Sequence, residues 1–450
     1  MIQARLSDAA QWSGAEFFGQ DAEFSGIEID SRRITPGSLF VALKGVHHDG
    51  HDHLDEAQSR GAVAAFVARP VTASLPLLIA KDTVPALGRL ATAWRRRFQL
   101  PVIAVLGSNG KTTVKELIAT ILRQQNGDTV LATQGNQNNA LGVPLTLFRL
   151  GSQHRTAVLE LGANGYGEIA TVSEMAKPDI AVITNAGLDH LAGFGGRAGA
   201  ALANGEVFSA MASNGIAILN GDDECLPIWC LKAGARPCLR FGFKPGVEVQ
   251  GNWQPQFDGG TLTIESPWNR IKTHLNLIGS HNALNALAAT SACLILGIEP
   301  DVVAAGLAAA RPVTGRLQSQ LGASGVHIID DTYNANPSSL AAALDTLAMM
   351  PGKKILVLGD MAELGDETDA WHSWAGQAAR AAGIVELFAV GKLTRLAAKS
   401  FGEGAHHLTD GQALVKALLP RLEPGVTILV KGSRCMAMES IVAELLHHNR

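Results

Sequence analysis

The chain has 450 residues, enough for about three domains of ~150 residues each. Its 37 Lys and Arg against 41 Asp and Glu give a net charge of −4, which argues against a nucleic-acid-binding protein, since such proteins usually carry a strongly basic domain. With 47% hydrophobic and 17% charged residues, every part of the chain can bury a core, which argues against disorder.

We expect a cytoplasmic protein that does not insert into a membrane. The stretch 1–18 lacks the basic and apolar regions of a secretory signal. Apolar runs such as 102–106 are far shorter than the ~18–20 residues that cross a bilayer. The five cysteines contain no CxxC pair. Three of them fall between 225 and 238, but their irregular spacing favours free thiols over a metal site.

The first two thirds of the chain change character near residue 83. Before it, short strand-like runs broken by Gly, Pro and His lie at 24–29, 38–43, 63–67 and 77–79. After it come helix 83–98, strand 102–106, a glycine loop, helix 112–124 and strands 157–161, 180–184 and 216–219. Continuous aliphatic runs that end in loops are typical of strands buried in a parallel sheet.

Antiparallel strands are predicted for residues 237–278. Residues 237–278 alternate more strongly between apolar and polar positions and precede a helix at 281–296. Alternating strands and helices then resume, at 326–329, 337–349, 354–358, 368–382, 387–390 and 426–430. We therefore predict an α/β fold with three domains: a small α+β N-terminal domain (1–82), a central, mostly parallel-sheet domain (83–312) and a C-terminal Rossmann-like domain (313–450).

The most informative segment is the glycine loop between strand 102–106 and helix 112–124. It reads Gly107, Ser108, Asn109, Gly110, Lys111, Thr112 and Thr113. Glycines let backbone N–H groups point at phosphate oxygens, and the helix N-terminus adds a favourable dipole. Lys111 would reach the β- and γ-phosphates and Thr112 would bind Mg²⁺. The general phosphate-loop pattern has glycine where this chain has Val105, so the loop is a variant, and a glycine-rich turn with a solvated lysine is the alternative.

The variant loop resembles the GTNGKT-type phosphate loop of the Mur ligase family, and further motifs match that family in the same order along nearly the whole chain. They are DSR at 30–32, PGSLFVALKG at 36–45, DGH at 49–51, GNQNN at 135–139, ELG at 160–162, TNAG at 184–187 with His190, HN at 281–282, GRL at 315–317, DTYNANP at 331–337, GDMAELG at 359–365 and KGSR at 431–434.

The resemblance implies an ATP-dependent amide ligase of peptidoglycan precursor synthesis, which joins D-alanyl-D-alanine to UDP-N-acetylmuramoyl-tripeptide through an acyl phosphate. It implies a P-loop-type ATPase fold for the central domain and UDP-substrate binding by the first domain. The ATP ligands would be the loop residues 107–113, with Arg316 at the γ-phosphate, Asp331 at the ribose and Asn282 near the adenine. Substrate contacts would come from Ser31, Arg32, Lys44, Asp49, His51, Asn136 and Asn139.

Two further residues lie at the ends of apolar strands or closely follow them, where doubly wound sheets place ligands. Glu160 and His190 offer a carboxylate and an imidazole, both of which hold divalent metal ions beside a triphosphate. A lone Glu or His at a strand end is more often a local hydrogen-bonding residue. The resemblance implies that Thr112 and Glu160 hold the nucleotide Mg²⁺, that Glu160 and His190 hold a second metal ion, and that Lys111, Glu160, His190 and Arg316 are catalytic.

Two polar runs have plainer interpretations. Residues 47–53 contain four His and two Asp, but loops solvate such runs easily, and metal binding is the least favoured interpretation. The acidic run Asp222, Asp223 and Glu224 follows strand 216–219 and is expected to be solvated.

One position departs from the family, which carries a carbamylated lysine in the segment that matches 203–206. This chain has Asn204 there, and it has no lysine between Lys177 and Lys232. An amide cannot react with CO₂ in this way. Three alternatives stay open: the site works without this charge, a small anion replaces it, or catalysis is weakened.

Two other functions stay open. A folylpolyglutamate-synthase-like ligase resembles the same central and C-terminal domains, but the block 30–45 speaks against it. A catalytically inactive nucleotide-binding protein is suggested by Asn204 alone. We expect a monomer. The third residue of the tripeptide, diaminopimelate or lysine, is not fixed by the sequence.

Overall fold

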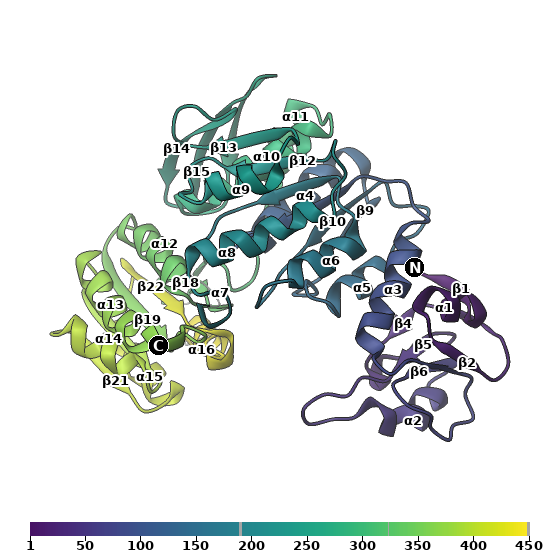
Figure 1. The fold of residues 1–450 in the computed structure, drawn as a ribbon. Helices are drawn as coiled ribbons and strands as arrows, with labels where there is room; N and C mark the ends of the chain where they lie inside the picture. Colours follow the sequence, from purple (N-terminus) through teal and green to yellow (C-terminus); the bar gives the residue numbers. More distant parts are fainter. Residues whose placement is uncertain (189–190, 323, 448–450) are drawn as a thin grey trace.

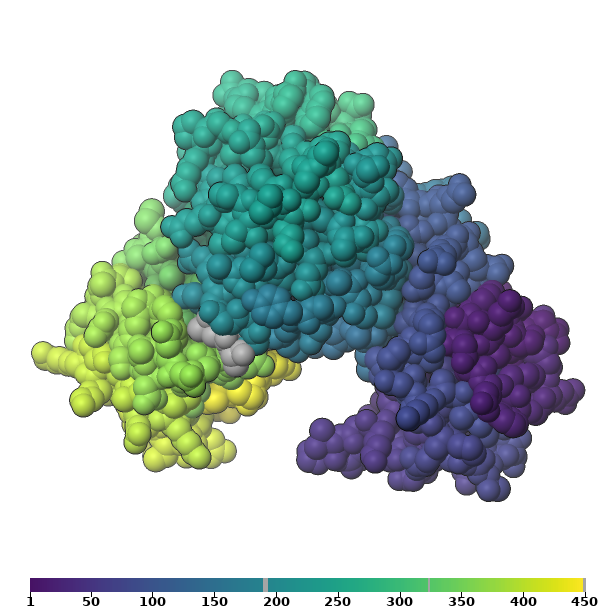
Figure 2. All heavy atoms as spheres, viewed as in Figure 1, coloured from purple at the N-terminus to yellow at the C-terminus, as the bar shows by residue number. Residues whose placement is uncertain are grey.

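The computed structural model describes residues 1–188, 191–322 and 324–447. The chain forms three α/β domains in sequence order, with mainly parallel sheets, which confirms the predicted fold class (Figure 1). The first and third domains lie on opposite sides of the central one, and a wide open space separates them beneath it (Figure 2).

The first domain has a five-stranded sheet of order β2-β7-β6-β5-β4 and a small β1-β3 pair within the described residues. Its elements are β1 Gln3–Arg5, α1 Leu6–Ser13, β2 Glu16–Phe18, β3 Glu23–Ser25, β4 Ile27–Glu28, β5 Leu39–Val41, α2 Leu54–Ser59, β6 Ala64–Val67 and β7 Leu77–Ile79. The run 24–29, predicted as one strand, is divided between β3 and β4, which belong to different sheets. The division falls at Gly26, whose φ of +86° turns the chain.

The central domain has a nine-stranded sheet, over the described residues, in the order β16-β15-β14-β13-β12-β11-β8-β10-β9. Its elements are α3 Thr83–Arg95, β8 Val102–Leu106, α4 Lys111–Asn126, β9 Val130–Ala132, α5 Gly142–Leu147, β10 Thr156–Glu160, α6 Glu168–Ala176, β11 Ile180–Ile183, α7 Leu191–Phe194, α8 Arg197–Asn204, β12 Ile216–Asn220, α9 Leu226–Ala233, β13 Cys238–Gly242, β14 Val249–Gln256, β15 Gly259–Glu265, β16 Arg270–Leu275, α10 Ser280–Ile295 and α11 Pro300–Ala309.

The order of the strands in this sheet decides where its loops meet. β8 lies between β10 and β11, and all three run parallel, as do β12, β13 and β14 beyond them. The antiparallel part predicted for 237–278 is therefore limited to β14, β15 and β16. Because the chain crosses from one side of β8 to the other after β10, the loops after β8, β10 and β11 open at one edge.

The third domain has a six-stranded sheet of order β17-β18-β22-β19-β20-β21 in the described part of the chain, parallel except for β17. Its elements are β17 Gln318–Leu321, β18 His327–Asp331, α12 Pro337–Ala348, β19 Lys353–Gly359, α13 Thr368–Ala381, β20 Glu386–Val390, α14 Thr394–Phe401, β21 Ala405–Leu408, α15 Gly411–Leu418, β22 Val426–Lys431 and α16 Glu439–His447. Strands β17 and β21 are additions to the predicted elements.

Helix α3 connects the first two domains. It packs against α1 of the first domain and against α5 and α6 of the central domain (Figure 1). Because α3 contacts both domains, its packing does not place the boundary at 82/83. The boundaries at 82/83 and 312/313 both stay predictions. No helix in the described ranges is both long enough and apolar enough to cross a membrane.

The packing of α13 on α14 depends on Gly376. A Cβ at this position would lie 2.0 Å from the carbonyl oxygen of Ala397 and 2.9 Å from the amide nitrogen of Phe401. We predict that Gly376→Ala lowers stability by about 1–3 kcal/mol, because the two helices must separate to admit the methyl group. Thermal unfolding measures the effect, with Gln377→Ala on the exposed side of α13 as the control. Equal unfolding midpoints for the two variants would contradict the close-packing interpretation.

Candidate active site

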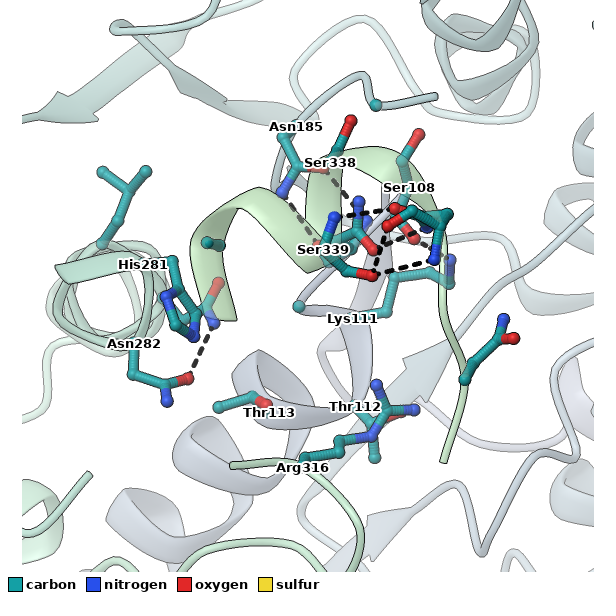
Figure 3. Close-up of a pocket in the computed structure, with 18 of the residues that line it drawn as sticks. Ser108, Lys111, Thr112, Thr113, Asn185, His281, Asn282, Arg316, Ser338 and Ser339 are labelled. Atoms are coloured by element: carbon teal, nitrogen blue, oxygen red, sulfur yellow. Dashed lines mark hydrogen bonds between the residues drawn. The ribbon is translucent and has the colours of Figure 1, made fainter. Parts of the chain in front are cut away.

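A cavity of about 630 Å³ lies between the central and third domains (Figure 3). It is bounded by the loop from β8 to α4, by the loops after β9, β11 and β12, by Glu160 at the end of β10, by the start of α10, and by segments 315–317 and 331–339. The carboxyl ends of four parallel strands meet there, which is where open parallel sheets place their ligands.

The phosphate loop is held against the loop that follows β11. The backbone N–H groups of Ser108 and Asn109 donate to the main-chain and side-chain oxygens of Asn185, both at 3.0 Å. Gly107 has a φ of +128°, and a Cβ there would lie 2.1 Å from Thr184 Oγ1. The close approach therefore requires glycine.

Lys111 begins α4 and reaches back over the loop. Its ammonium donates to the carbonyl oxygens of Gly107 at 2.5 Å and Ser108 at 3.1 Å. The loop thus places a cation beside its own backbone N–H groups, an arrangement suited to the β- and γ-phosphates of a nucleotide.

A buried carboxylate lies next to this loop. Glu160 ends β10, is 2% exposed, and accepts hydrogen bonds at 2.8 Å from the Thr112 hydroxyl and from the Asn138 amide. The Arg316 guanidinium also contacts the Thr112 oxygen, at 3.0 Å (Figure 3). Thr112 is thereby shared between the carboxylate of the central domain and a cation of the third domain.

Two buried polar atoms of the cavity wall lack hydrogen-bond partners within the described residues. They are the Ser108 hydroxyl and Nε of Arg316. The Arg316 guanidinium lies over the ring of Tyr333, 4.1 Å from its centroid, which fixes its plane. Because buried polar groups normally have partners, the Ser108 hydroxyl and the Arg316 Nε–H suit a ligand that offers hydrogen-bond acceptors.

The donor set fits a magnesium ion bound together with a nucleotide. Thr112 and Glu160 supply the hard oxygen atoms that Mg²⁺ prefers, and Mg²⁺ usually takes one or two carboxylates plus phosphates. No group of three or more His, Cys, Asp or Glu suited to a metal occurs in the described part of the chain. His190, predicted as a metal ligand, lies outside the described residues.

The opposite end of the cavity is formed by the start of α10. Asn282 donates from its amide to the carbonyl oxygen of Ile278, just before α10, and its side-chain oxygen accepts from Asn285 at 3.2 Å. Burial of the His281 imidazole lowers its pKa to about 4, so the ring is neutral at pH 7. A Cβ on Gly110 would lie 2.4 Å from Asn285 Oδ1, so α10 also supports the phosphate loop.

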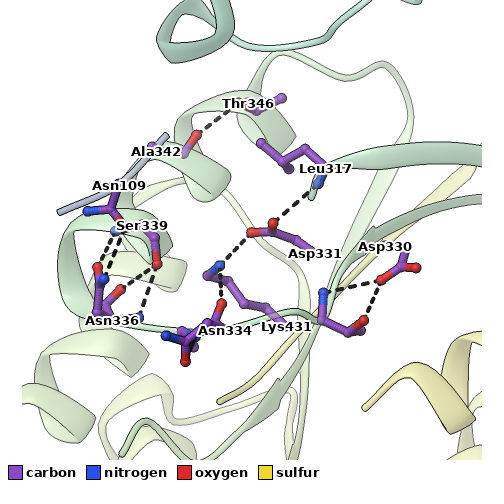
Figure 4. Close-up of polar contacts among 12 residues, drawn as sticks. Asn109, Leu317, Asp330, Asp331, Asn334, Asn336, Ser339, Ala342, Thr346 and Lys431 are labelled. Atoms are coloured by element: carbon purple, nitrogen blue, oxygen red, sulfur yellow. Dashed lines mark hydrogen bonds and ion pairs between the residues drawn. The ribbon is translucent and has the colours of Figure 1, made fainter. Parts of the chain in front are cut away.

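The third domain enters the cavity through a strained turn. Leu317 has a φ of +48°, which costs a non-glycine residue about 1–3 kcal/mol. Its N–H donates to Asp331 Oδ1 at 3.2 Å, while Asp331 Oδ2 pairs with the buried Lys431 ammonium at 2.5 Å (Figure 4). The ion pair therefore supports the turn that carries Arg316.

Helix α12 also contacts the phosphate loop. Asn336 forms a capping box with Ser339 and donates from Nδ2 to Asn109 Oδ1 at 3.0 Å (Figure 4). Ser338 accepts from the N–H of Leu188 at 3.0 Å. The third domain thus contacts both the phosphate loop and the loop that follows β11.

The predicted substrate residues of the first domain lie away from this cavity. Ser31 donates to Glu56 at 2.7 Å, and the 78% exposed Arg32 side chain pairs with Asp30 at 2.8 Å. Lys44 forms an isolated β-bridge with Asp49. Hydrogen bonds from His51 lower the pKa of Asp49 to about 2.

The run 47–53 is ordered by local contacts. The His51 ring lies 2.5 Å from Asp49 and accepts from the N–H of Ala68 at 2.9 Å, so both ring nitrogens are occupied. His53 lies 3.5 Å from Glu56. His51 therefore holds the loop to the segment that follows β6, and His53 holds it to α2.

The loop after β9 has a divided role. Asn136 lines the cavity, whereas Asn139 Oδ1 accepts from the N–H groups of Leu141 and Gly142 at the start of α5. The sequence did not single out Asn138, Asn185 or Lys431 as site residues. Each belongs to a quoted motif, but only the contacts assign them to the site.

One interpretation of polar residues changes, and the alternatives at Asn204 stay open. Asp222 and Asp223 are not simply solvated, because they accept from the N–H groups of Phe243 and Ala186 at 2.7 and 2.9 Å. Asn204 is buried and donates to Ala200 O of its own helix at 2.8 Å, and it is absent from the described residues that line the cavity.

Comparisons with known proteins agree with this architecture. The chain matches the Mur ligase family, catalytic domain over 23–95, the Mur ligase middle domain over 105–293 and the Mur ligase, glutamate ligase domain over 315–434. It is 43% identical over 449 residues to the UDP-N-acetylmuramoyl-tripeptide–D-alanyl-D-alanine ligase of Escherichia coli, covering 99% of both chains.

Solved structures give the same result. A crystal structure of MurF from Acinetobacter baumannii is similar with a TM-score of 0.92 and 33% identity, covering 98% of both chains. MurF ligase from Thermotoga maritima in complex with ADP is similar with a TM-score of 0.83 and 27% identity, covering 94% of this chain and 97% of that one. From these matches along its whole length, this chain belongs to the Mur ligase family.

Proposed function

We propose that this Mur ligase is an ATP-dependent amide ligase that adds D-alanyl-D-alanine to UDP-N-acetylmuramoyl-tripeptide in peptidoglycan precursor synthesis. The observation that carries the chemistry is the 3.0 Å contact between Arg316 and Thr112, which brings a third-domain cation to the phosphate loop. The substrates are supported by the E. coli relative's name, and ATP by the ADP complex of the T. maritima neighbour.

In the proposed reaction, the tripeptide carboxylate attacks the γ-phosphorus of ATP, giving an acyl phosphate and ADP. The amine of D-alanyl-D-alanine then attacks the acyl carbon, an amide forms and inorganic phosphate leaves. Lys111 and Arg316 stabilise the charge on the transferred phosphoryl group, since such transfer depends on cations at its oxygens. Contacts between α12 and the phosphate loop keep the third domain aligned with it.

A magnesium ion would be held by Thr112, Glu160 and the nucleotide phosphates, with His190 and Glu160 proposed for a second ion. Such ions neutralise charge on the phosphate oxygens when bound. At the adenosine end, Asp331 and Asn282 are proposed to bind the ribose and the adenine.

The UDP part of the substrate is proposed to bind the first domain, through Ser31, Arg32, Lys44, Asp49 and His51. An exposed guanidinium and an ammonium are suitable partners for a pyrophosphate. Asn136 and Asn139 are proposed to contact the substrate nearer the cavity. We further propose that the protein works as a monomer in the cytoplasm.

A phosphate-release assay tests the function. Release should require ATP, UDP-N-acetylmuramoyl-tripeptide and D-alanyl-D-alanine together, and each release should match one amide formed. Phosphate release without amide formation would indicate an ATP hydrolase and contradict the ligase function. No release with diaminopimelate- and lysine-containing tripeptides alike would favour a catalytically inactive nucleotide-binding protein instead.

Lys111→Ala should lower the ligation rate by about 10³-fold or more, because it removes the cation at the transferred phosphate. The measurement is steady-state phosphate release, and thermal unfolding checks that the fold is kept. Lys399→Ala, at an exposed position of α14, is the matched control and should keep full activity. Near-normal turnover of Lys111→Ala would refute the role of the loop.

Arg32→Ala should raise the KM for the UDP substrate several-fold and leave the KM for ATP unchanged. Arg32 lies in the first domain, where its side chain is 78% exposed, and the ATP loop lies in the second. Initial rates with each substrate varied in turn separate the two constants. A variant impaired mainly in its use of ATP would contradict the proposed division between domains.

A further inference from the structure

Lys115 is a buried charged residue to which the proposed mechanism gives no role. It lies on α4, one turn beyond Lys111, and is only 1% exposed. Burying an ammonium is costly unless hydrogen bonds and charges compensate for the lost water. An apolar side chain would fill the same space without this cost, so the contacts made by the ammonium indicate what it does.

The ammonium joins α4 to the chain that follows β9. It donates to the carbonyl oxygen of Thr133 at 2.8 Å and pairs with Glu116 at 2.5 Å. Thr133 continues the pairing of β9 with β10, because its N–H donates to Val158 O at 3.1 Å. Lys115 therefore fixes the end of β9 relative to the helix that carries the phosphate-loop residues.

Thr133 also contacts Glu160, so it connects Lys115 to the proposed metal ligand. Its hydroxyl oxygen accepts from the backbone N–H of Glu160 at 3.0 Å, and both residues are 2% exposed. The Glu160 carboxylate then accepts from Thr112, which lies on α4 with Lys115. Three hydrogen bonds thus connect Lys115, Thr133, Glu160 and Thr112, and helix α4, which carries both Lys115 and Thr112, closes the circuit. We call this circuit the α4–β10 ring. It runs through α4, β9 and β10, which pack against one another (Figure 1).

A bound metal ion would affect one half of the α4–β10 ring directly and leave the other half unchanged. The Thr112 half contains two proposed magnesium ligands, whose side chains must serve the metal ion when it is bound. The Lys115–Thr133 half contacts the main chain of Glu160 and leaves its carboxylate untouched. It can therefore hold the strand end in place whether or not the site is occupied.

We infer that Lys115 is a positioning residue, which acts through Thr133 to hold Glu160 at the magnesium site. This inference rests on the proposed function, because it takes Glu160 as a metal ligand. Partners that orient metal ligands without touching the ion typically change metal affinity or activity by 10–100-fold when they are lost.

The test measures ADP binding by titration calorimetry, with millimolar Mg²⁺ and with EDTA. The dissociation constant in EDTA divided by that in Mg²⁺ reports how much magnesium tightens ADP binding, without any turnover. We call this quotient the ratio. Lys115→Met and Thr133→Val should each reduce this ratio by about 10-fold or more and leave binding in EDTA nearly unchanged. Thr133→Ser keeps the hydroxyl and should retain the wild-type ratio.

Ile118→Ala is the matched control. It removes a buried apolar group from the same helix without touching the ring, so it should lower the unfolding temperature and keep the ratio. If Lys115→Met and Thr133→Val also keep the wild-type ratio, Lys115 has only a structural role and the inference is overturned. Should Lys115→Met fail to fold, Thr133→Val decides, since it removes the next hydrogen bond of the ring.

Glu160→Gln separates this failure from failure of the proposed function. Among these variants, Glu160→Gln should have the lowest ratio. If wild type itself gains nothing from Mg²⁺ and Glu160→Gln binds ADP like wild type, the proposed metal role of Glu160 is wrong, and the inference falls with it. If Glu160→Gln lowers the ratio while Lys115→Met and Thr133→Val retain the wild-type ratio, only the inference about Lys115 fails.

Discussion

The hydrogen bond between Thr112 and Glu160 links the elements on which the rest of the site depends. Thr112 lies in the first turn of α4, which forms the last part of the phosphate loop, and Glu160 ends β10, the strand paired with β8. A carboxylate that is 2% exposed can be kept at this depth only because neighbouring groups donate to it. The same placement leaves a carboxylate and a hydroxyl together beside the backbone N–H groups of the loop.

The third domain completes this arrangement from outside. Arg316, Asn336 and Ser338 contact the phosphate loop or the adjacent loop after β11, and all three lie within one stretch of the chain. The stretch begins at the strained turn of Leu317. Asp331, which is paired with the buried Lys431, holds this turn by accepting from the N–H of Leu317. Movement of the third domain would therefore move a cation toward or away from Thr112, which couples the position of the domain to the charge at the phosphate site.

The first domain contributes differently, since its contacts to the central domain run mainly through α3. Its predicted substrate residues are held by local ion pairs such as Arg32–Asp30, at a distance from the cavity. The open space between the first and third domains suits a long substrate that has its nucleotide end on one domain and its reacting carboxylate near the loop (Figure 2).

The sequence by itself determined the fold class, many of the buried strands and the motifs. Continuous aliphatic runs specify buried parallel strands whatever surrounds them, and the glycine loop before α4 needs only local geometry, so the fold class and the phosphate loop were predictable. The family resemblance supplied the candidate roles of Glu160, Arg316 and Asp331.

Only the tertiary structure decided which of these side chains meet. The contact of Arg316 with Thr112 joins residues 204 positions apart, and the pairing of Lys431 with Asp331 joins strands that are distant in sequence. The tertiary structure also divided the run 24–29 between two sheets and made Lys115 part of the α4–β10 ring. Periodicity reports which face of an element is buried, whereas such contacts depend on strand order and domain placement, which no local pattern encodes.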